Sequence, residues 1–165
     1  MSEQAAQKLY PVLPLKNTVL FPYLLMPLSV GRSHSLAAVQ AALGTEDKEI
    51  ILIAQKDPAV EVPTQNDMYA VGTKAVIRKM ARPNENLMEV LVMGVERVTV
   101  NSVVLQDGFL QADVTTLPLP EDKGAEVEAL HSSIVELATR AIELAQPQAP
   151  APAPDAERIA PGAGR

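Results

Sequence analysis

The spacing of apolar residues changes once along this chain, at Leu117–Pro118–Leu119–Pro120. Before this point, short segments alternate apolar and polar residues, a pattern typical of half-buried strands. After it, apolar residues recur every three or four positions, which is the spacing of an amphipathic helix. The sequence therefore predicts a mainly β, α+β protein, in which a β-rich first part (residues 9–118) is followed by one long helix.

The β-rich part is divided by glycine, proline and asparagine into evenly spaced strands. The predicted strands cover residues 10–15, 26–30, 49–54, 71–80, 87–95, 98–105 and 110–115. Asp107–Gly108 is a strong hairpin signal, and strands at this spacing predict a small closed or nearly closed barrel. One short helix is expected over residues 33–43, with Ser33 or Ser35 as its N-cap and Gly44 at its end.

The second part predicts a single helix from Glu121 to Gln146, within a segment 119–146. An apolar stripe along this helix is the predicted helix interface; it consists of Val127, Leu130, Ile134, Leu137, Ala141 and Leu144. A stripe of this length needs a partner, which is the barrel, another copy of the chain, or helices outside this chain. The Pro/Ala-rich tail, residues 147–165, is expected to be disordered, and residues 1–8 are expected to form a flexible N-terminus.

Composition excludes several classes of function. The chain has no cysteine, so thiolate metal sites and disulfides are excluded. Its formal net charge of −6 argues against nucleic acid as a partner. Neither a phosphate-binding glycine loop nor a nucleophile motif is present, and His34 and His131 stand alone. We therefore expect no catalytic residue, metal or cofactor, no membrane partner, and a cytoplasmic protein.

A binding function is best placed in the proline-bounded stretch between the first two predicted strands. Pro22 and Pro27 interrupt regular structure there, so its apolar side chains cannot all be hidden by alternation. The candidate binding residues are Phe21, Tyr23, Leu24, Leu25 and Met26, with Arg32 as a polar contact. The alternative is that Phe21, Leu25 and Leu28 close one end of the barrel, and that Arg32 is solvated.

Five motifs, in the same order, resemble the Lon protease N-terminal domain family. They are YPVLPLKNTVLFP at residues 10–22, MPLSVGR at 26–32, AQKDP at 54–58, MYAVGT at 68–73 and VLVMGVER at 90–97. The resemblance covers residues 10 to about 117. It implies a PUA-like β-barrel followed by helical segments.

The resemblance also implies a role in proteolysis without catalysis by this chain. In the full-length proteases this domain recruits unfolded or tagged substrates and helps to hold a hexamer, and ATPase and Ser-Lys protease modules follow it. The expected partners are thus unfolded or damaged polypeptides, and either the ATPase and protease domains or other copies of the chain. The alternative is a stand-alone structural, oligomerisation or adaptor module, and RNA binding is less favoured because acidic residues outnumber basic ones.

Overall fold

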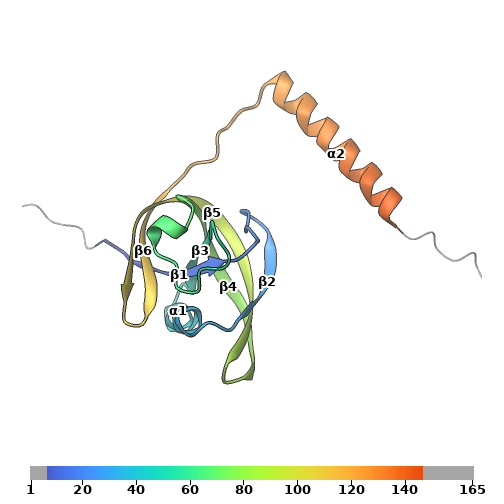
Figure 1. Ribbon diagram of the computed structural model, residues 1–165. Helices are drawn as coiled ribbons and strands as arrows, with labels where there is room; N and C mark the ends of the chain where they lie inside the picture. Colours follow the sequence, from blue (N-terminus) through green and yellow to red (C-terminus); the bar gives the residue numbers. More distant parts are fainter. Residues whose placement is uncertain (1–6, 147–165) are drawn as a thin grey trace, which may run out of the picture. The chain divides into compact units, whose positions relative to one another are not determined.

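The computed structural model describes residues 7–146. The chain divides into two compact units, the first ending at Leu119 and the second beginning at Pro120, close to the change in apolar spacing in the sequence. Figure 1 shows the β-rich first unit and the helix of the second. The predicted tail, residues 147–165, and the first six residues lie outside the described residues.

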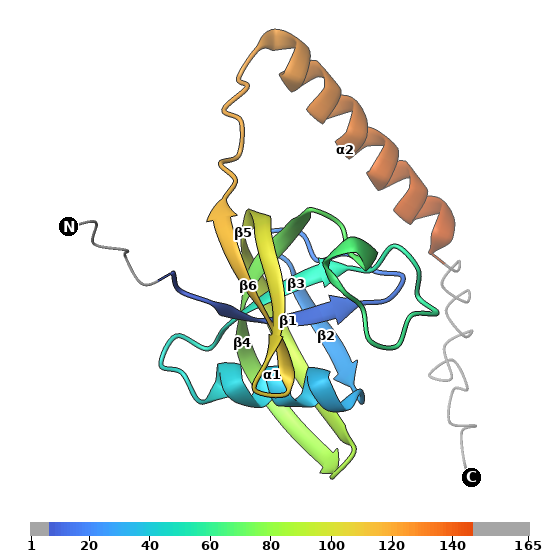
Figure 2. The ribbon, with the colours of Figure 1, turned by 60° about the vertical axis from the view of Figure 1, so that its left-hand side comes forward.

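The first unit is built mainly of strands, so the predicted α+β class is confirmed. Its elements are β1 (Tyr10–Leu15), β2 (Leu25–Val30), α1 (Ser33–Leu43), β3 (Glu49–Ala54), the 3₁₀ turn η1 (Gln65–Asp67), β4 (Val71–Asn84), β5 (Leu87–Gln106) and β6 (Phe109–Thr116). Figure 2 shows α1 lying across one end of the sheet. The turn η1 begins with a capping box between Thr64 and Asp67, as the spacing of these residues predicts.

The sheet closes on itself through its first and last strands. Its order is β2-β5-β4-β3-β1-β6, and β6 pairs in addition with β5. β1 joins β6 through Tyr10 and Pro11 and is parallel to β3. Strands β5, β4, β3, β1 and β6 therefore form a ring, as predicted, and β2 is attached outside this ring to the first half of β5.

β5 is one strand of 20 residues, whereas the sequence predicted two strands over residues 87–95 and 98–105. The ladder to β4 continues through Glu96 and Arg97, so no turn separates the two halves. The ladder to β4 skips Val95 and the ladder to β6 skips Asn101. These irregularities let β5 bend without ending, because a bulge increases local twist and curvature. Residues 87–99 of β5 thus pair with β4 and residues 88–93 also with β2, whereas residues 98–106 pair with β6.

β3 reads EIILIA and is buried on both faces, as its continuous apolar run predicts. Ile50 and Leu52 belong to one core cluster, together with Val39 of α1. Ile51 and Ile53 belong to a second cluster with residues of β1, β5 and β6. Because successive side chains of a strand point to opposite faces, this short strand supplies both cores of the unit.

Helix α1 begins one residue earlier than the predicted caps allow. Its N-cap is Arg32, which makes no side-chain capping hydrogen bond, so the predicted cap at Ser33 or Ser35 is wrong. Ser35 instead lies on the buried face with Ala38, Val39 and Ala42. The predicted end at Gly44 is confirmed by the hydrogen bond from the Gly44 N–H to the Gln40 carbonyl.

The second unit contains α2 (Ala125–Ala145), which starts four residues later than predicted. Gly124 is its N-cap, and Glu126 and Glu128 occupy its first turn. None of its residues is buried, and all six residues of the predicted stripe are exposed. No helix within the described residues has both the length and the apolar character needed to cross a membrane.

Candidate functional site

The connection between β1 and β2 presents apolar side chains at the surface. We call residues 19–25 the apolar loop. The exposed fractions of its large side chains range from 47% for Phe21 to 77% for Tyr23, and Val19, Leu24 and Leu25 lie between these values. Met26, one residue further along β2, is half-buried. The structure thus leaves four of the five predicted apolar binding residues exposed.

The apolar loop is nevertheless fixed to the barrel at both ends. Leu20 is buried in the core, and its carbonyl accepts a hydrogen bond of 2.6 Å from the Thr73 hydroxyl on β4. The Tyr23 N–H donates to the Gly94 carbonyl, and the Gly94 N–H donates to the Leu24 carbonyl, each at 2.9 Å. Of the residues considered as an alternative for closing this end of the barrel, Phe21 and Leu25 are thus exposed, whereas Leu28 packs partly buried against the core cluster that contains Leu20.

Close packing at β5 requires the glycine at position 94. A Cβ added to Gly94 would lie 2.3 Å from the Phe21 carbonyl oxygen, well inside van der Waals contact. Tyr23 sits in the left-handed region with φ of 66°, which reverses the chain between Phe21 and Leu24. The backbone of the loop is thus held against β5 while its side chains point elsewhere.

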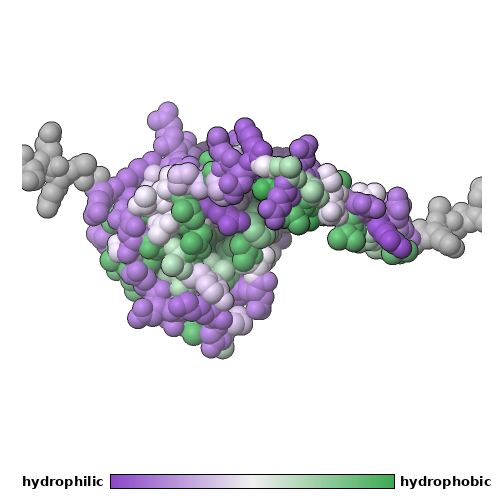
Figure 3. All heavy atoms as spheres, turned by 90° about the horizontal axis from the view of Figure 1, so that it is seen from above, coloured by the Kyte–Doolittle hydropathy of each residue, from purple (hydrophilic) through white to green (hydrophobic). Residues whose placement is uncertain are grey.

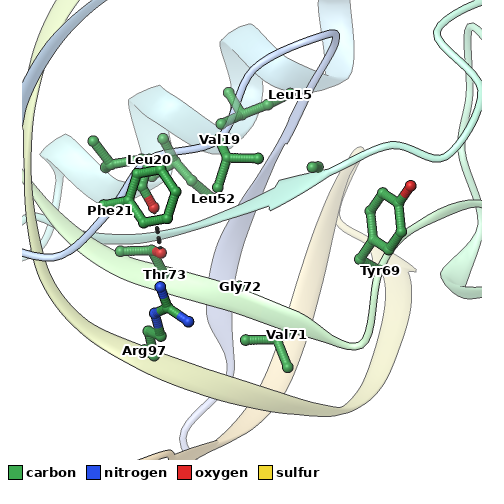
Figure 4. A pocket seen from close by; sticks show the side chains of 11 residues that line it. Leu15, Val19, Leu20, Phe21, Leu52, Tyr69, Val71, Gly72, Thr73 and Arg97 are labelled. Carbon is green, nitrogen blue, oxygen red and sulfur yellow. Dashed lines mark hydrogen bonds between the residues drawn. The ribbon is translucent and has the colours of Figure 1, made fainter. Parts of the chain in front are cut away.

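An apolar pocket with a volume of about 140 Å³ lies next to the loop. Figure 4 shows its walls, which come from the end of β1, the apolar loop, β3, β4 with the residues just before it, and β5. They include Leu15, Val19, Leu20, Phe21, Leu52, Tyr69, Val71, Gly72, Thr73 and Arg97. We call this hollow and the exposed side chains of the apolar loop the apolar face.

Arg97 lies at the edge of the apolar face. Its guanidinium carbon is 5.5 Å from the centroid of the Phe21 ring, within the range of a cation–π contact. The Arg97 guanidinium thus packs against one face of the Phe21 ring. In Figure 3, apolar side chains (green) gather around a hollow on the surface of the first unit, with hydrophilic residues around them.

Sequence reasoning missed part of this face. Val19, Tyr69 and Val71 are 45–54% exposed, and all three line the pocket. Tyr69 and Val71 are two positions apart, the spacing that places side chains on one side of an extended chain. The sequence therefore carries a signal for this part of the face, although it predicts only that a strand begins at residue 71.

Arg32 is engaged within the first unit. Its guanidinium donates to the Gln55 Oε1 at 2.7 Å and to the Pro14 carbonyl at 2.6 Å. Burial lowers the pKa of Arg32 from its usual value, and the charge of Glu61 opposes that shift. These bonds join the N-cap of α1 to β1 and to the residue that follows β3. A contact from Arg32 to a partner stays a prediction.

The apolar face offers surface for binding, and its lining does not group side chains in a catalytic arrangement. Within residues 7–146, no three His, Cys, Asp or Glu side chains are grouped to hold a metal ion. The side chains around the pocket are aliphatic or aromatic apart from Thr73 and Arg97, and the Thr73 hydroxyl is used by Leu20. Such an arrangement can bury apolar groups of a ligand and place the positive charge of Arg97 next to them.

The chain matches the family model described as the ATP-dependent protease La (LON) substrate-binding domain over residues 9–159. It is 50% identical over 139 residues to a Lon protease of Nitrosococcus oceani, covering 84% of this chain and 18% of that protein. It is 40% identical to a Lon protease of Xanthomonas oryzae, covering 77% of this chain and 15% of the relative. The chain thus spans less than a fifth of the length of these relatives.

Solved structures give the same architecture. The N-terminal domain of a Mycobacterium avium complex Lon protease superposes with a TM-score of 0.68 at 21% identity, covering 82% of this chain and 68% of that one. A Lon N-terminal domain protein from Xanthomonas campestris gives a TM-score of 0.57 at 19% identity, over 79% of this chain and 72% of its own. At these identities the likeness concerns the fold.

Proposed function

Because this chain belongs to the LON substrate-binding domain family, we propose that it binds unfolded polypeptide segments on its apolar face. The observation that carries the proposal is the combination of exposed side chains and a fixed backbone in the apolar loop. Phe21, Tyr23, Leu24 and Leu25 are all exposed, although hydrogen bonds to Gly94 and Thr73 hold the loop.

This combination suits recognition of unfolded chains. Contiguous exposed apolar surface marks interaction sites, and apolar side chains are the feature that unfolded segments share. A loop that is already ordered loses little conformational freedom on binding. The hollow beside Phe21 accepts one apolar side chain of the bound segment. The exposed residues around the hollow contact the neighbouring side chains of that segment.

We further propose that the chain recruits substrates for ATP-dependent proteolysis and does not itself cleave them. The relatives are Lon proteases of which this chain matches less than a fifth. The apolar face supplies binding groups, and the resemblance implies that the serine-lysine chemistry of the full-length proteases belongs to a different module from the one that this chain matches. Unfolded or damaged polypeptides are therefore the proposed ligands.

A fluorescence-anisotropy titration with a labelled, permanently unfolded polypeptide tests this proposal. Leu25→Ser removes a side chain that is 58% exposed on the apolar face, and Leu105→Ser removes one that is 61% exposed on β5. We expect Leu25→Ser to weaken binding about tenfold, since burying a leucine contributes about 1.5–3 kcal/mol. Leu105→Ser is the matched control and is expected to bind like the wild-type chain.

Salt separates apolar recognition from charge attraction in the same titration. Binding through the apolar face persists at high ionic strength, because screening acts on charges. Equal affinities of Leu25→Ser and wild type, with unchanged circular dichroism, would contradict the proposal. Binding that disappears in salt would contradict it as well.

A second candidate function is assembly through α2. None of its residues is buried, and Leu130, Ile134 and Leu137 of the apolar stripe are 59–67% exposed. A helix with such a stripe gains most of its stability from packing, and another copy of α2 offers a complementary stripe. Sedimentation velocity of the wild type and of Ile134→Glu, with Ser133→Glu as control, tests self-association. A monomer at all concentrations of the wild type removes this candidate.

A further inference from the structure

The barrel has an opening between β1 and β2. β1 meets β6 only at Tyr10 and Pro11, and from Val12 onward its ladder runs to β3. Beyond Pro11, the side of β1 away from β3 opens into a pocket of about 350 Å³. We call it the seam pocket; it is lined by Leu13, Pro14, Leu15, Lys16, Thr18, Leu28, Ser29, Val30, Gly31, Arg32 and Ser35.

The seam pocket combines an apolar floor with a polar rim. The floor consists of core side chains, among them Leu13, Leu15 and Val30. The rim includes Lys16, Arg32 at the N-cap of α1, and Ser35 in the first turn of α1. This pocket belongs to a different part of the barrel from the apolar pocket, with which it shares only Leu15.

The buried hydroxyl of Ser35 lacks a hydrogen-bond partner among the described residues, which indicates a ligand group at this place. The residue is 2% exposed, and its Oγ has no hydrogen-bond partner within the described residues. A buried hydroxyl without a partner carries a desolvation cost of about 1–3 kcal/mol, so native proteins rarely contain one. Because Ser35 lines the seam pocket, a ligand there can accept this hydrogen bond.

The charges around Ser35 favour an anion. The N-terminus of α1 receives no side-chain cap, so its first N–H groups and the positive end of the helix dipole remain available. Arg32 and Lys16 add positive charge at the rim. The Lys16 ammonium now pairs with the Glu61 carboxylate at 2.9 Å, and the Glu61 side chain is 73% exposed, so an incoming carboxylate can displace it.

We propose that the seam pocket binds the C-terminal residue of a polypeptide, with its carboxylate at Ser35 and the start of α1 and its apolar side chain on the leucine and valine floor. A chain end is the polypeptide group that carries a carboxylate and an apolar side chain on one carbon atom. An aspartate or glutamate carboxylate lacks the second group and leaves the floor empty. The pocket volume lies within the usual range for ligand sites, about 300–1,000 Å³. This inference rests on the proposed function, since it assigns one end of the same bound polypeptide.

Three labelled peptides of one unfolded sequence test the proposal by anisotropy. The first ends in leucine with a free carboxylate, the second ends in leucine amide, and the third is the amide with an internal aspartate. We expect the free acid to bind about tenfold more tightly than either amide, because a hydrogen bond to a charged group contributes about 1.5–3 kcal/mol.

Variants of the chain separate this pocket from the apolar face. Ser35→Ala weakens the free acid alone, about five- to tenfold, and Glu61→Gln strengthens it because Lys16 is released. Leu25→Ser weakens the acid and the amide equally. In the wild type, the free acid shifts the backbone amide resonances of Ser33 and Ser35, whereas the amide leaves them in place.

The outcomes distinguish failure of this inference from failure of the proposed function. If the acid and the amide bind equally and Leu25→Ser weakens both, the seam pocket is excluded and the apolar face stands. Equal binding of the aspartate peptide and the free acid also excludes a chain-end site. If the acid is preferred and Leu25→Ser has no effect, the seam pocket stands and the apolar face is excluded. Absence of binding by all three peptides overturns both.

Discussion

The Thr73 hydroxyl on β4 donates a hydrogen bond of 2.6 Å to the Leu20 carbonyl, across 53 positions of sequence. Both residues are buried. The bond satisfies a loop carbonyl that would otherwise be unpaired inside the protein, where such a group costs about 1–3 kcal/mol. By fixing the Leu20 backbone, this hydrogen bond also orients the Leu20 side chain into the core and leaves the neighbouring Phe21 at the surface.

Thr73→Val is therefore expected to destabilise the chain by about 1–3 kcal/mol, because it keeps the shape of the side chain and removes the donor. Chemical denaturation measures the change in the free energy of unfolding. Thr73→Ser retains the hydroxyl and is expected to lose less stability than Thr73→Val. Equal losses in the two variants would show that packing, and not the hydrogen bond, holds the loop.

Gly94→Ala is expected to displace the apolar loop. The added Cβ would approach the Phe21 carbonyl oxygen to 2.3 Å, so the loop must move away from β5. We expect a loss of stability of about 1–3 kcal/mol together with weaker binding of unfolded polypeptide.

Gly44→Ala is the control for this substitution. A Cβ on Gly44 would meet its nearest atom at 3.4 Å, and its φ of −74° is accessible to alanine. Denaturation midpoints and anisotropy are expected to stay near wild-type values for this variant. A Gly94→Ala protein with wild-type stability and binding would show that the loop is not tied to β5.

The stability of the protein is expected to fall between neutral pH and mildly acidic pH because of His34. Burial, followed by the charge of Arg32, lowers the pKa of His34 below its usual 6.5, and its buried Nε2 has no hydrogen-bond partner among residues 7–146. A lowered folded pKa means that the unfolded chain binds the proton first. The contribution of neutral His34 to the free energy of unfolding is therefore complete above pH 6.5. It is lost as the pH falls from 6.5 through the pKa of His34 in the folded protein.

His34→Gln is expected to flatten this part of the dependence of unfolding free energy on pH. His131→Gln removes the other histidine, which is exposed on α2, and is expected to leave the dependence unchanged. The measurement is urea denaturation at intervals between pH 7.5 and pH 5. Parallel curves for the wild type and His34→Gln would contradict the assignment.

Ser35→Ala is expected to stabilise the free protein by about 1 kcal/mol. The substitution removes a buried hydroxyl that has no hydrogen-bond partner in the part of the chain that the structure describes, and alanine is also the better helix former. Thermal denaturation without ligand measures the effect. Ser33→Ala, at the exposed first position of α1, is expected to change stability by less than about 0.5 kcal/mol. Destabilisation by Ser35→Ala would indicate that the hydroxyl is already satisfied in the free protein.

Local sequence signals predicted the parts of the fold that neighbouring residues determine. The Asp107–Gly108 turn forms with both residues at positive φ, 55° and 83°, as a two-residue hairpin requires. The burial of β3 followed from its unbroken apolar run. Exposure of the apolar loop followed from prolines that interrupt alternation around it.

Features that depend on contacts between residues far apart in the chain could not be predicted from the sequence. Nothing local shows that β5 continues through Val95 and Glu96, because its continuity comes from the ladder to β4. The identity of the buried loop residue depends on Thr73, and the pocket wall at Tyr69 and Val71 exists only because β4 passes the loop. The caps of α1 were predicted wrongly because serine is a common cap, whereas here packing against the core places Ser35 inside.

The pairing of Tyr10 with Ala112 has a consequence for biosynthesis. The first strand leaves the ribosome about a hundred residues before its partner, a delay of roughly 5 to 20 seconds at 5–20 residues per second. During that interval β1 lacks β6, and the ring remains an open sheet with an unpaired edge. A domain proposed to capture unfolded chains is thus, until its last strand emerges, a nascent chain that itself presents the edges and apolar surfaces typical of an unfinished protein.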